Sequence, residues 1–172
     1  MYGKSTGNQR IEAWWSILRR QCTDFWISRF KTIAATGVLN VDDPVHIQCL
    51  RFCFLSLLQR DLSRMVIEWN THRINARKIY GQISGKPDKM YFLPEEFDVH
   101  NYGCSFNERA IMRVKEELEQ ETGHIEMVHP SFVRVVNVLI PEWKTPQSYE
   151  EGLQLFCKLI LNIYIMVYVH FF

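Results

Sequence analysis

Two long runs of apolar residues at three- and four-residue spacing constrain the fold of this chain more than any other feature. The first run recurs from Ile11 to Ile33 and the second from Ile47 to Trp69. An α-helix completes a turn every 3.6 residues, so this spacing gathers the apolar side chains on one face. Gly37 is typical of a helix end, and the stretch from Asn40 to Pro44 has the composition of a turn. The sequence therefore predicts two long helices, the first beginning near Asn8.

The first predicted helix also carries a polar face. Opposite the apolar residues, Glu12 shares this face with Arg19 and Arg20 at helical spacing. A basic stripe beside a carboxylate suits a helix that lies along a phosphate backbone, although an ordinary solvated face is the alternative. Glu12 by itself has two interpretations, a metal-binding carboxylate or an acid that stabilises the start of a helix through the macrodipole.

The second predicted helix leads into a basic loop. Its end reads Glu68-Trp69-Asn70-Thr71-His72-Arg73-Ile74, and more cations follow at Arg77, Lys78, Lys86 and Lys89. Residues 1–90 hold 14 Lys and Arg against 7 Asp and Glu, whereas residues 91–172 hold 6 against 12. The near-neutral total therefore conceals a basic half and an acidic half. The loop is a candidate for phosphate contacts, with an ordinary exposed loop as the alternative.

Two blocks of residues resemble a known family. The segment Gly7-Asn8-Gln9-Arg10-Ile11-Glu12-Ala13-Trp14-Trp15 resembles the Asn-x-Arg-Ile-Glu-x-x-Trp helix of integrase core domains, in the RNase H-like superfamily of retroviral integrases and transposases. Those cores typically close with an aromatic-Asn pair, an Arg/His loop and a proline-bearing segment. Here the pair is Trp69-Asn70, the loop begins with His72-Arg73, and the prolines are Pro87 and Pro94. The resemblance covers residues 5–94.

The resemblance implies that Glu12 is the third of three carboxylates that hold two divalent metals for DNA strand transfer, with Mg²⁺ or Mn²⁺ as cofactor. It also implies DNA as the partner. The residues expected to contact it are Arg10, Arg19, Arg20, Asn70, Arg73, Arg77 and Lys78. Eleven residues precede Glu12, and none of them is Asp or Glu. We therefore expect the C-terminal, helical part of such a core with the central sheet largely missing, and neither metal binding nor catalysis by this chain alone.

The remaining residues predict further helices, so the expected fold class is mainly α, with an integrase-like part at 1–94 and a helical extension at 95–172. Residues 107–122 read as an exposed acidic helix, and another helical run begins at Thr145. The apolar stretch from Phe132 to Ile140 is either a helix or a strand. A helical protein-interaction module without a nucleic-acid role is the alternative function.

The C-terminal run from Leu153 to Phe172 is almost continuously apolar, with Lys158 and Asn162 as interruptions. A membrane-spanning helix needs about 20 apolar residues. A helix of the protein core is therefore favoured over a tail anchor, and a membrane is not expected as a partner. An incorrectly assigned end of the chain is a third alternative.

Five cysteines without a Cys-x-x-Cys pair indicate a reducing compartment, so we predict an intracellular location, and the nucleus would be consistent with DNA as partner. His46, Cys49 and Cys53 share a helix face and would begin a zinc site. Because a fourth ligand is not evident, buried apolar thiols are favoured.

The first helix carries Trp14, Trp15 and Trp26 on its apolar side. If the sheet that normally covers such a helix is missing, these indoles lie uncovered in water. Exposed apolar patches of this kind mark interaction or aggregation sites. We therefore expect the chain to self-associate through this tryptophan face.

Overall fold

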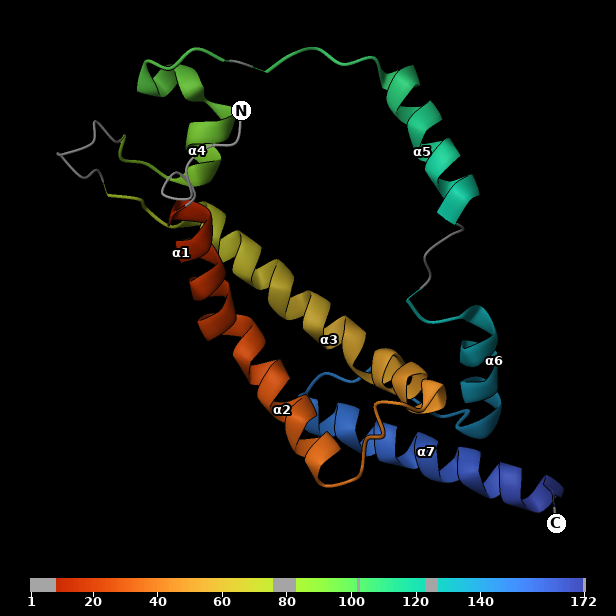
Figure 1. Cartoon of the computed structure of the whole chain (residues 1–172). Helices are drawn as coiled ribbons and strands as arrows, with labels where there is room; N and C mark the ends of the chain where they lie inside the picture. Colours follow the sequence, from red (N-terminus) through yellow and green to blue (C-terminus); the bar gives the residue numbers. More distant parts are fainter. Residues whose placement is uncertain (1–8, 76–82, 102, 123–126, 172) are drawn as a thin grey trace. The chain divides into compact units, whose positions relative to one another are not determined.

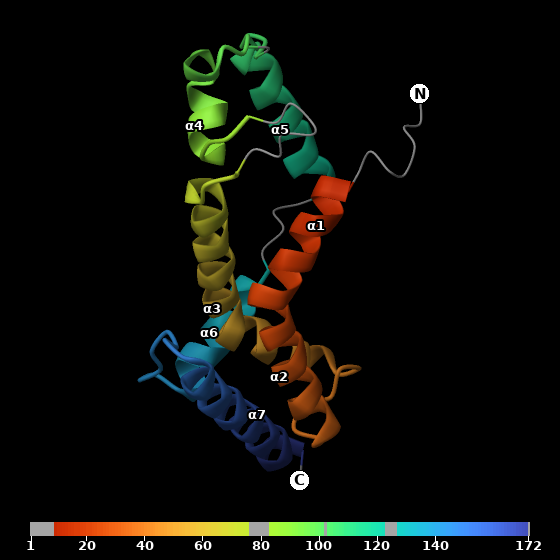
Figure 2. The same cartoon turned by 90° about the vertical axis from the view of Figure 1, so that its left-hand side faces the viewer.

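The structure is a computed structural model that describes residues 9–75, 83–101, 103–122 and 127–171 (Figures 1 and 2). Within these residues the chain is helical, and extended backbone pairs at a single bridge between Ile74 and Gly85. The predicted mainly-α fold class is confirmed. The elements in chain order are α1 (Gln9–Leu18), the π-helical turn η2 (Arg19–Thr23), α2 (Asp24–Ala35), α3 (Pro44–Thr71), α4 (Pro87–Phe92), the 3₁₀ turn η4 (Pro94–Phe97), α5 (Glu108–Thr122), α6 (Pro130–Leu139) and α7 (Tyr149–Phe171).

The chain forms two compact units. The first unit comprises residues 1–65 and 127–172, and the second comprises residues 66–126. Helix α3 begins in the first unit and ends in the second. The first unit therefore combines residues from the two ends of the chain.

Four helices build the core of the first unit. Figure 1 shows α2, the beginning of α3 and α7 drawn together, with α6 beside the start of α3. The buried residues come from these helices and the loops that follow α2 and α6: Trp26, Ile33, Leu39, Cys49, Cys53, Phe54, Leu57, Val136, Ile140, Phe156 and Leu159. Helices from the C-terminal part of the chain therefore share one core with the two long helices near its N-terminus.

A π-helical turn interrupts the first long helix, which the sequence predicted as regular. The residues packed on this side recur at steps of four: Trp14, Leu18, Cys22, Trp26 and Phe30. In a regular α-helix, residues four apart drift around the axis by about 40° at each step. The wider turn of η2 offsets part of that drift. Leu18 and Cys22 can therefore pack beside Met65 of α3 while Trp26 enters the main core.

The expectation of an uncovered tryptophan face is wrong for Trp26, which is 5% exposed. Its ring centroid lies 6.2 Å from that of Phe54 on α3 and 6.4 Å from that of Tyr149 on α7. Trp14 is half-buried, whereas Trp15 is 58% exposed. The expectation failed because α3 and α7 cover the face that was assigned to a missing sheet.

Local sequence explains where the last two helices begin. Helix α6 resolves the ambiguous apolar stretch as a helix. It starts at Pro130, and the side chain of His129 accepts a hydrogen bond from the backbone N–H of Ser131. Helix α7 starts at Tyr149, four residues after the predicted Thr145, and the hydroxyl of Ser148 accepts a hydrogen bond from the backbone N–H of Glu151.

Helix α7 is a core helix over its first half only. Phe156 and Leu159 are fully buried, but from Leu161 onward most side chains are exposed. Among the described residues, the segment Tyr149–Val169 is long and apolar enough to cross a membrane by length and composition alone, and 17% of an apolar 18-residue stretch within it is buried. The predicted core helix is therefore correct for the turns that contact α3 and α6.

The second unit contains the end of α3, α4, η4 and α5. The ammonium of Lys89 on α4 lies 2.9 Å from a carboxylate oxygen of Glu96 in η4. Helix α5 is exposed along its length where its side chains are described, including the apolar residues Ile111 and Val114. The predicted exposed helix over residues 107–122 is confirmed.

Gly152 provides a test of the core because a side chain at this position has no space. An ideal Cβ there would lie 2.7 Å from the ring carbon Cε1 of Phe54. Glycine to alanine inside a helix normally stabilises by about 1 kcal/mol, but overpacking a core costs about 1–3 kcal/mol. We expect Gly152→Ala to lower the urea midpoint of unfolding, whereas Gln154→Ala, at an exposed position of the same helix, leaves it nearly unchanged. A higher midpoint for Gly152→Ala would contradict this packing.

Candidate functional site

Glu12 lies on α1 with an exposed side chain, as the interpretation of a polar face requires. Two other carboxylates on neighbouring elements of the first unit are engaged in structural contacts. Asp24 accepts a hydrogen bond of 3.0 Å from Nε of Arg19. Asp61 accepts one of 3.1 Å from the indole N–H of Trp26, and its other oxygen lies 3.6 Å from the guanidinium of Arg64.

The residues around Glu12 do not fit a two-metal centre. Mg²⁺ takes hard oxygen ligands in an octahedron, and a pair of ions needs several converging carboxylates. In the described part of the chain, His, Cys, Asp and Glu form no group of three or more that could hold a metal ion. A lone exposed carboxylate binds such ions weakly, so no chemical step through a metal follows from this arrangement.

The predicted basic residues of the first unit differ in what they contact. Arg19 and Arg20 both lie in η2 and are exposed, but the guanidinium of Arg19 forms an ion pair with Asp24. Arg29 of α2, which was not among the predicted site residues, has its guanidinium 4.8 Å from the ring centroid of Tyr149, in a cation–π contact. Arg10 belongs to α1, and its side chain lies outside the described residues. The exposed guanidinium of Arg20 is therefore the best-placed candidate for a phosphate contact.

The remaining predicted residues lie in or beside the second unit. Asn70 is half-buried in the last turn of α3, and Arg73 is exposed directly after the helix. The ring of Trp69 packs against that of His72, with centroids 4.5 Å apart. Arg77 and Lys78 fall outside the described residues. The structure thus places Asn70 and Arg73 together at the end of α3, and Glu12, Arg19 and Arg20 together on α1 and η2.

A comparison with models of protein families shows to which family the chain is related. A family model described as an integrase core domain matches residues 1–87, which is half of the chain. The chain belongs to the integrase core domain family. The match includes the Glu12 helix and the segment from Trp69-Asn70 to Pro87, whereas Pro94 lies beyond it, and the resemblance to this family was correct. Searches among curated proteins and among solved structures gave no match.

In this integrase-family chain, His46 has a role that spacing alone did not indicate. The backbone N–H of Asn40 donates to Nδ1 of His46 at 3.2 Å, and Nε2 lies 3.2 Å from the hydroxyl of Tyr164 on α7. That hydroxyl lies 3.5 Å from a carboxylate oxygen of Asp43. Because both ring nitrogens have partners, His46 joins the start of α3 to α7. These contacts favour a structural role over the zinc alternative.

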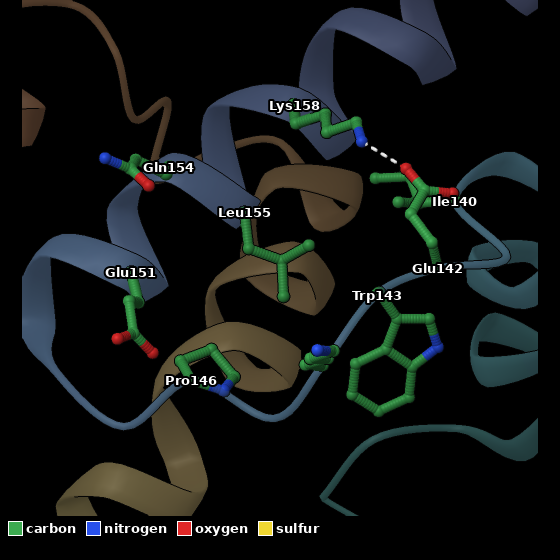
Figure 3. Close-up of a pocket in the computed structure, with 9 residues that line it drawn as sticks. Ile140, Glu142, Trp143, Pro146, Glu151, Gln154, Leu155 and Lys158 are labelled. Carbon is green, nitrogen blue, oxygen red and sulfur yellow. Dashed lines mark hydrogen bonds and ion pairs between the residues drawn. The ribbon is translucent and has the colours of Figure 1, made fainter.

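A shallow hollow of about 250 Å³ lies elsewhere on the first unit (Figure 3). The ring of Trp143 and the side chain of Leu155 line it, and the ion pair between Lys158 and Glu142 lies at its edge. Its walls come from residues 140–158, away in sequence from every predicted site residue. Trp143 also packs on Phe52, with ring centroids 4.6 Å apart. The hollow is therefore a feature of the α6–α7 connection and a separate place from the Glu12 face.

The cysteines give a test of the core around α3. Burial raises the pKa of the Cys49 thiol to about 12 and also raises the pKa values of Cys22 and Cys53. Because the thiolate is the reactive form, these thiols are both protonated and inaccessible at neutral pH. Cys104 and Cys157 are exposed. We expect two thiols of the native protein to react with Ellman's reagent between pH 7 and 8.5, and all five after unfolding in guanidinium chloride. Fast reaction of a third thiol in the folded protein would contradict the packing.

Proposed function

We propose that this chain is an integrase-derived domain that binds nucleic acid and does not catalyse strand transfer on its own. In this proposal residues 1–94 correspond to the C-terminal part of an RNase H-like core. The observation that carries it is the family match over residues 1–87, because that stretch coincides with the basic half of the chain.

Electrostatics support the binding part of the proposal. A duplex carries a dense row of phosphates, and cationic side chains that neutralise them release condensed counterions. The exposed residues Arg20 and Lys31 lie on the first long helix, and Arg73 is exposed after α3. Contacts of this kind position a protein on the backbone without reading the base sequence. We therefore propose binding with little sequence preference.

The arrangement of carboxylates supports the second part of the proposal. Strand transfer in this family requires a pair of divalent metals, and the chemistry needs several carboxylates that converge on them. Among the described residues, Glu12 does not form a group with two further carboxylates that could hold a metal. Asp24 is ion-paired with Arg19, and Asp61 accepts a hydrogen bond from the indole of Trp26. The complete family domain would take Mg²⁺ or Mn²⁺. For this chain alone we propose no metal cofactor.

Binding to a labelled DNA duplex at several salt concentrations tests the proposal. We expect log K to fall linearly with log salt, and Arg20→Ala to reduce the slope by about 0.9 if one phosphate contact is lost. Arg29→Ala is the matched control, because this arginine lies over the ring of Tyr149. It should change stability more than the salt slope. Affinity that does not vary with salt, or absence of binding by the folded chain at low salt, would overturn the proposal.

Glu12→Gln separates a metal ligand from a solvated carboxylate. The substitution removes one negative charge near cationic residues, so we expect slightly tighter DNA binding and no change in its dependence on Mg²⁺. The measurement compares wild type and variant with and without Mg²⁺ at constant ionic strength. A gain in affinity with Mg²⁺ that Glu12→Gln abolishes would show that the carboxylate does hold an ion in this chain.

A protein-interaction module is the second candidate, favoured by one observation. On α5, Ile111 and Val114 are each more than half exposed on an otherwise charged helix. An apolar stripe on a charged helix is typical of a surface that docks on another protein. The duplex assay discriminates between the two functions, since a module of this kind would leave DNA unbound at low salt.

A further inference from the structure

The end of α7 is apolar and largely exposed. Six consecutive residues have exposed fractions from 42% to 71%: Tyr164, Ile165, Met166, Val167, Tyr168 and Val169. Successive residues of an α-helix are about 100° apart, so six of them occupy the whole circumference. Leu161, one turn earlier, is 61% exposed. On one side the hydroxyl of Tyr164 lies 3.2 Å from Nε2 of His46, so the helix still contacts the start of α3 there. Beyond Tyr164 the apolar surface surrounds the helix and is not confined to one face.

This distribution restricts what can cover the helix. A partner protein typically covers one apolar stripe and leaves a polar face in water, as amphipathic helices show. A helix that is apolar all round requires surroundings that are apolar all round, which a lipid bilayer supplies. From Leu159 to Val169 the chain contains no charged residue. Lipid therefore fits this surface better than a docked protein does.

Polar contacts mark where the folded unit ends and this surface begins. Lys158 is ion-paired with Glu142. The side-chain amide of Asn162 donates to the backbone carbonyl of Lys158 at 2.9 Å. These two residues were the interruptions that argued against a membrane segment in the sequence. In the structure both have partners. Ile163 still packs against the core of the first unit and Tyr164 contacts His46, so the exposed end of α7 begins after Tyr164.

We propose that Ile165–Val169 inserts into one leaflet of a lipid bilayer while α7 up to Tyr164 remains packed in the first unit. At a rise of 1.5 Å per residue, these five residues reach about 7 Å, about a quarter of the roughly 30 Å hydrocarbon core. Phe156 and Leu159 stay buried against the first unit, so the helix does not span the membrane. An insertion of this depth stays near the interface of the bilayer, so we expect it to be reversible.

Flotation of the full chain with vesicles of zwitterionic phosphatidylcholine tests the insertion. We expect the wild type to float with the vesicles, and Ile165→Glu with Val169→Glu to reduce the bound fraction at least tenfold, because each adds a charge to the inserted surface. The matched control is Val135→Glu with Val138→Glu, two exposed apolar positions on α6. The control should float like the wild type. Circular dichroism and thermal unfolding establish that both double variants are folded.

A depth probe gives a second readout. Val167→Cys, labelled with an environment-sensitive dye after Cys104→Ser and Cys157→Ser remove the exposed thiols, should shift to shorter emission wavelength with vesicles. Failure of the folded wild type to float, or flotation that survives Ile165→Glu with Val169→Glu, would overturn the proposal. So would self-association without lipid that these substitutions abolish, since a second copy would then be the occupant. Arg20→Ala should leave flotation unchanged, which separates this proposal from DNA binding.

Discussion

Phe54 is the residue on which the packing of the first unit depends. It is 2% exposed, and its ring lies between residues of α2 and α7. The centroid of its ring is 5.4 Å from that of Phe30 and 5.6 Å from that of Tyr149. Tilted and edge-to-face contacts of this kind contribute about 0.5–1.5 kcal/mol each beyond the burial of area. Gly152 permits the approach because it has no Cβ. A single side chain of the integrase-family region thus joins it to a helix from the C-terminal end.

Polar groups at the margins of this core determine which carboxylates are available for chemistry. The indole N–H of Trp26 needs an acceptor because it is buried, and Asp61 supplies one. Asp43 lies close to both His46 and Tyr164 where α3 begins. These acids therefore hold helices together. Glu12 differs from them because its side chain lies on an exposed face, which is compatible with either a solvated acid or one ligand of a larger site.

Periodicity predicted the long helices well, because the pattern over residues 47–69 depends only on the spacing of apolar residues within α3. It did not predict η2, because the spacing of apolar residues alone does not distinguish a π-helical turn from a regular one, and Cys22 of η2 packs in the cluster with Met65. The burial of Trp26 was also missed, because α7, one of the two helices that cover it, begins more than 100 residues later. For the site, the family motif singled out Glu12, whose side chain is exposed in the structure, and its role as a metal ligand stays a prediction. The spacing of residues could not reveal the ion pair between Arg19 and Asp24, because it depends on the positions of the two side chains.

The two proposed binding surfaces of this chain differ in how their affinity depends on salt. Phosphate binding by residues such as Arg20 depends on counterion release and weakens steeply as salt increases. Burial of uncharged residues such as Ile165 responds little to moderate salt, and excluded salts such as sulfate strengthen it. Lys158 forms an ion pair with Glu142 near the middle of α7. The residues from Leu159 to Val169 include no charged side chain, so this end of the helix does not attract DNA electrostatically. Ionic strength therefore separates the two activities in the intact chain, and occupancy of one surface need not compete with the other.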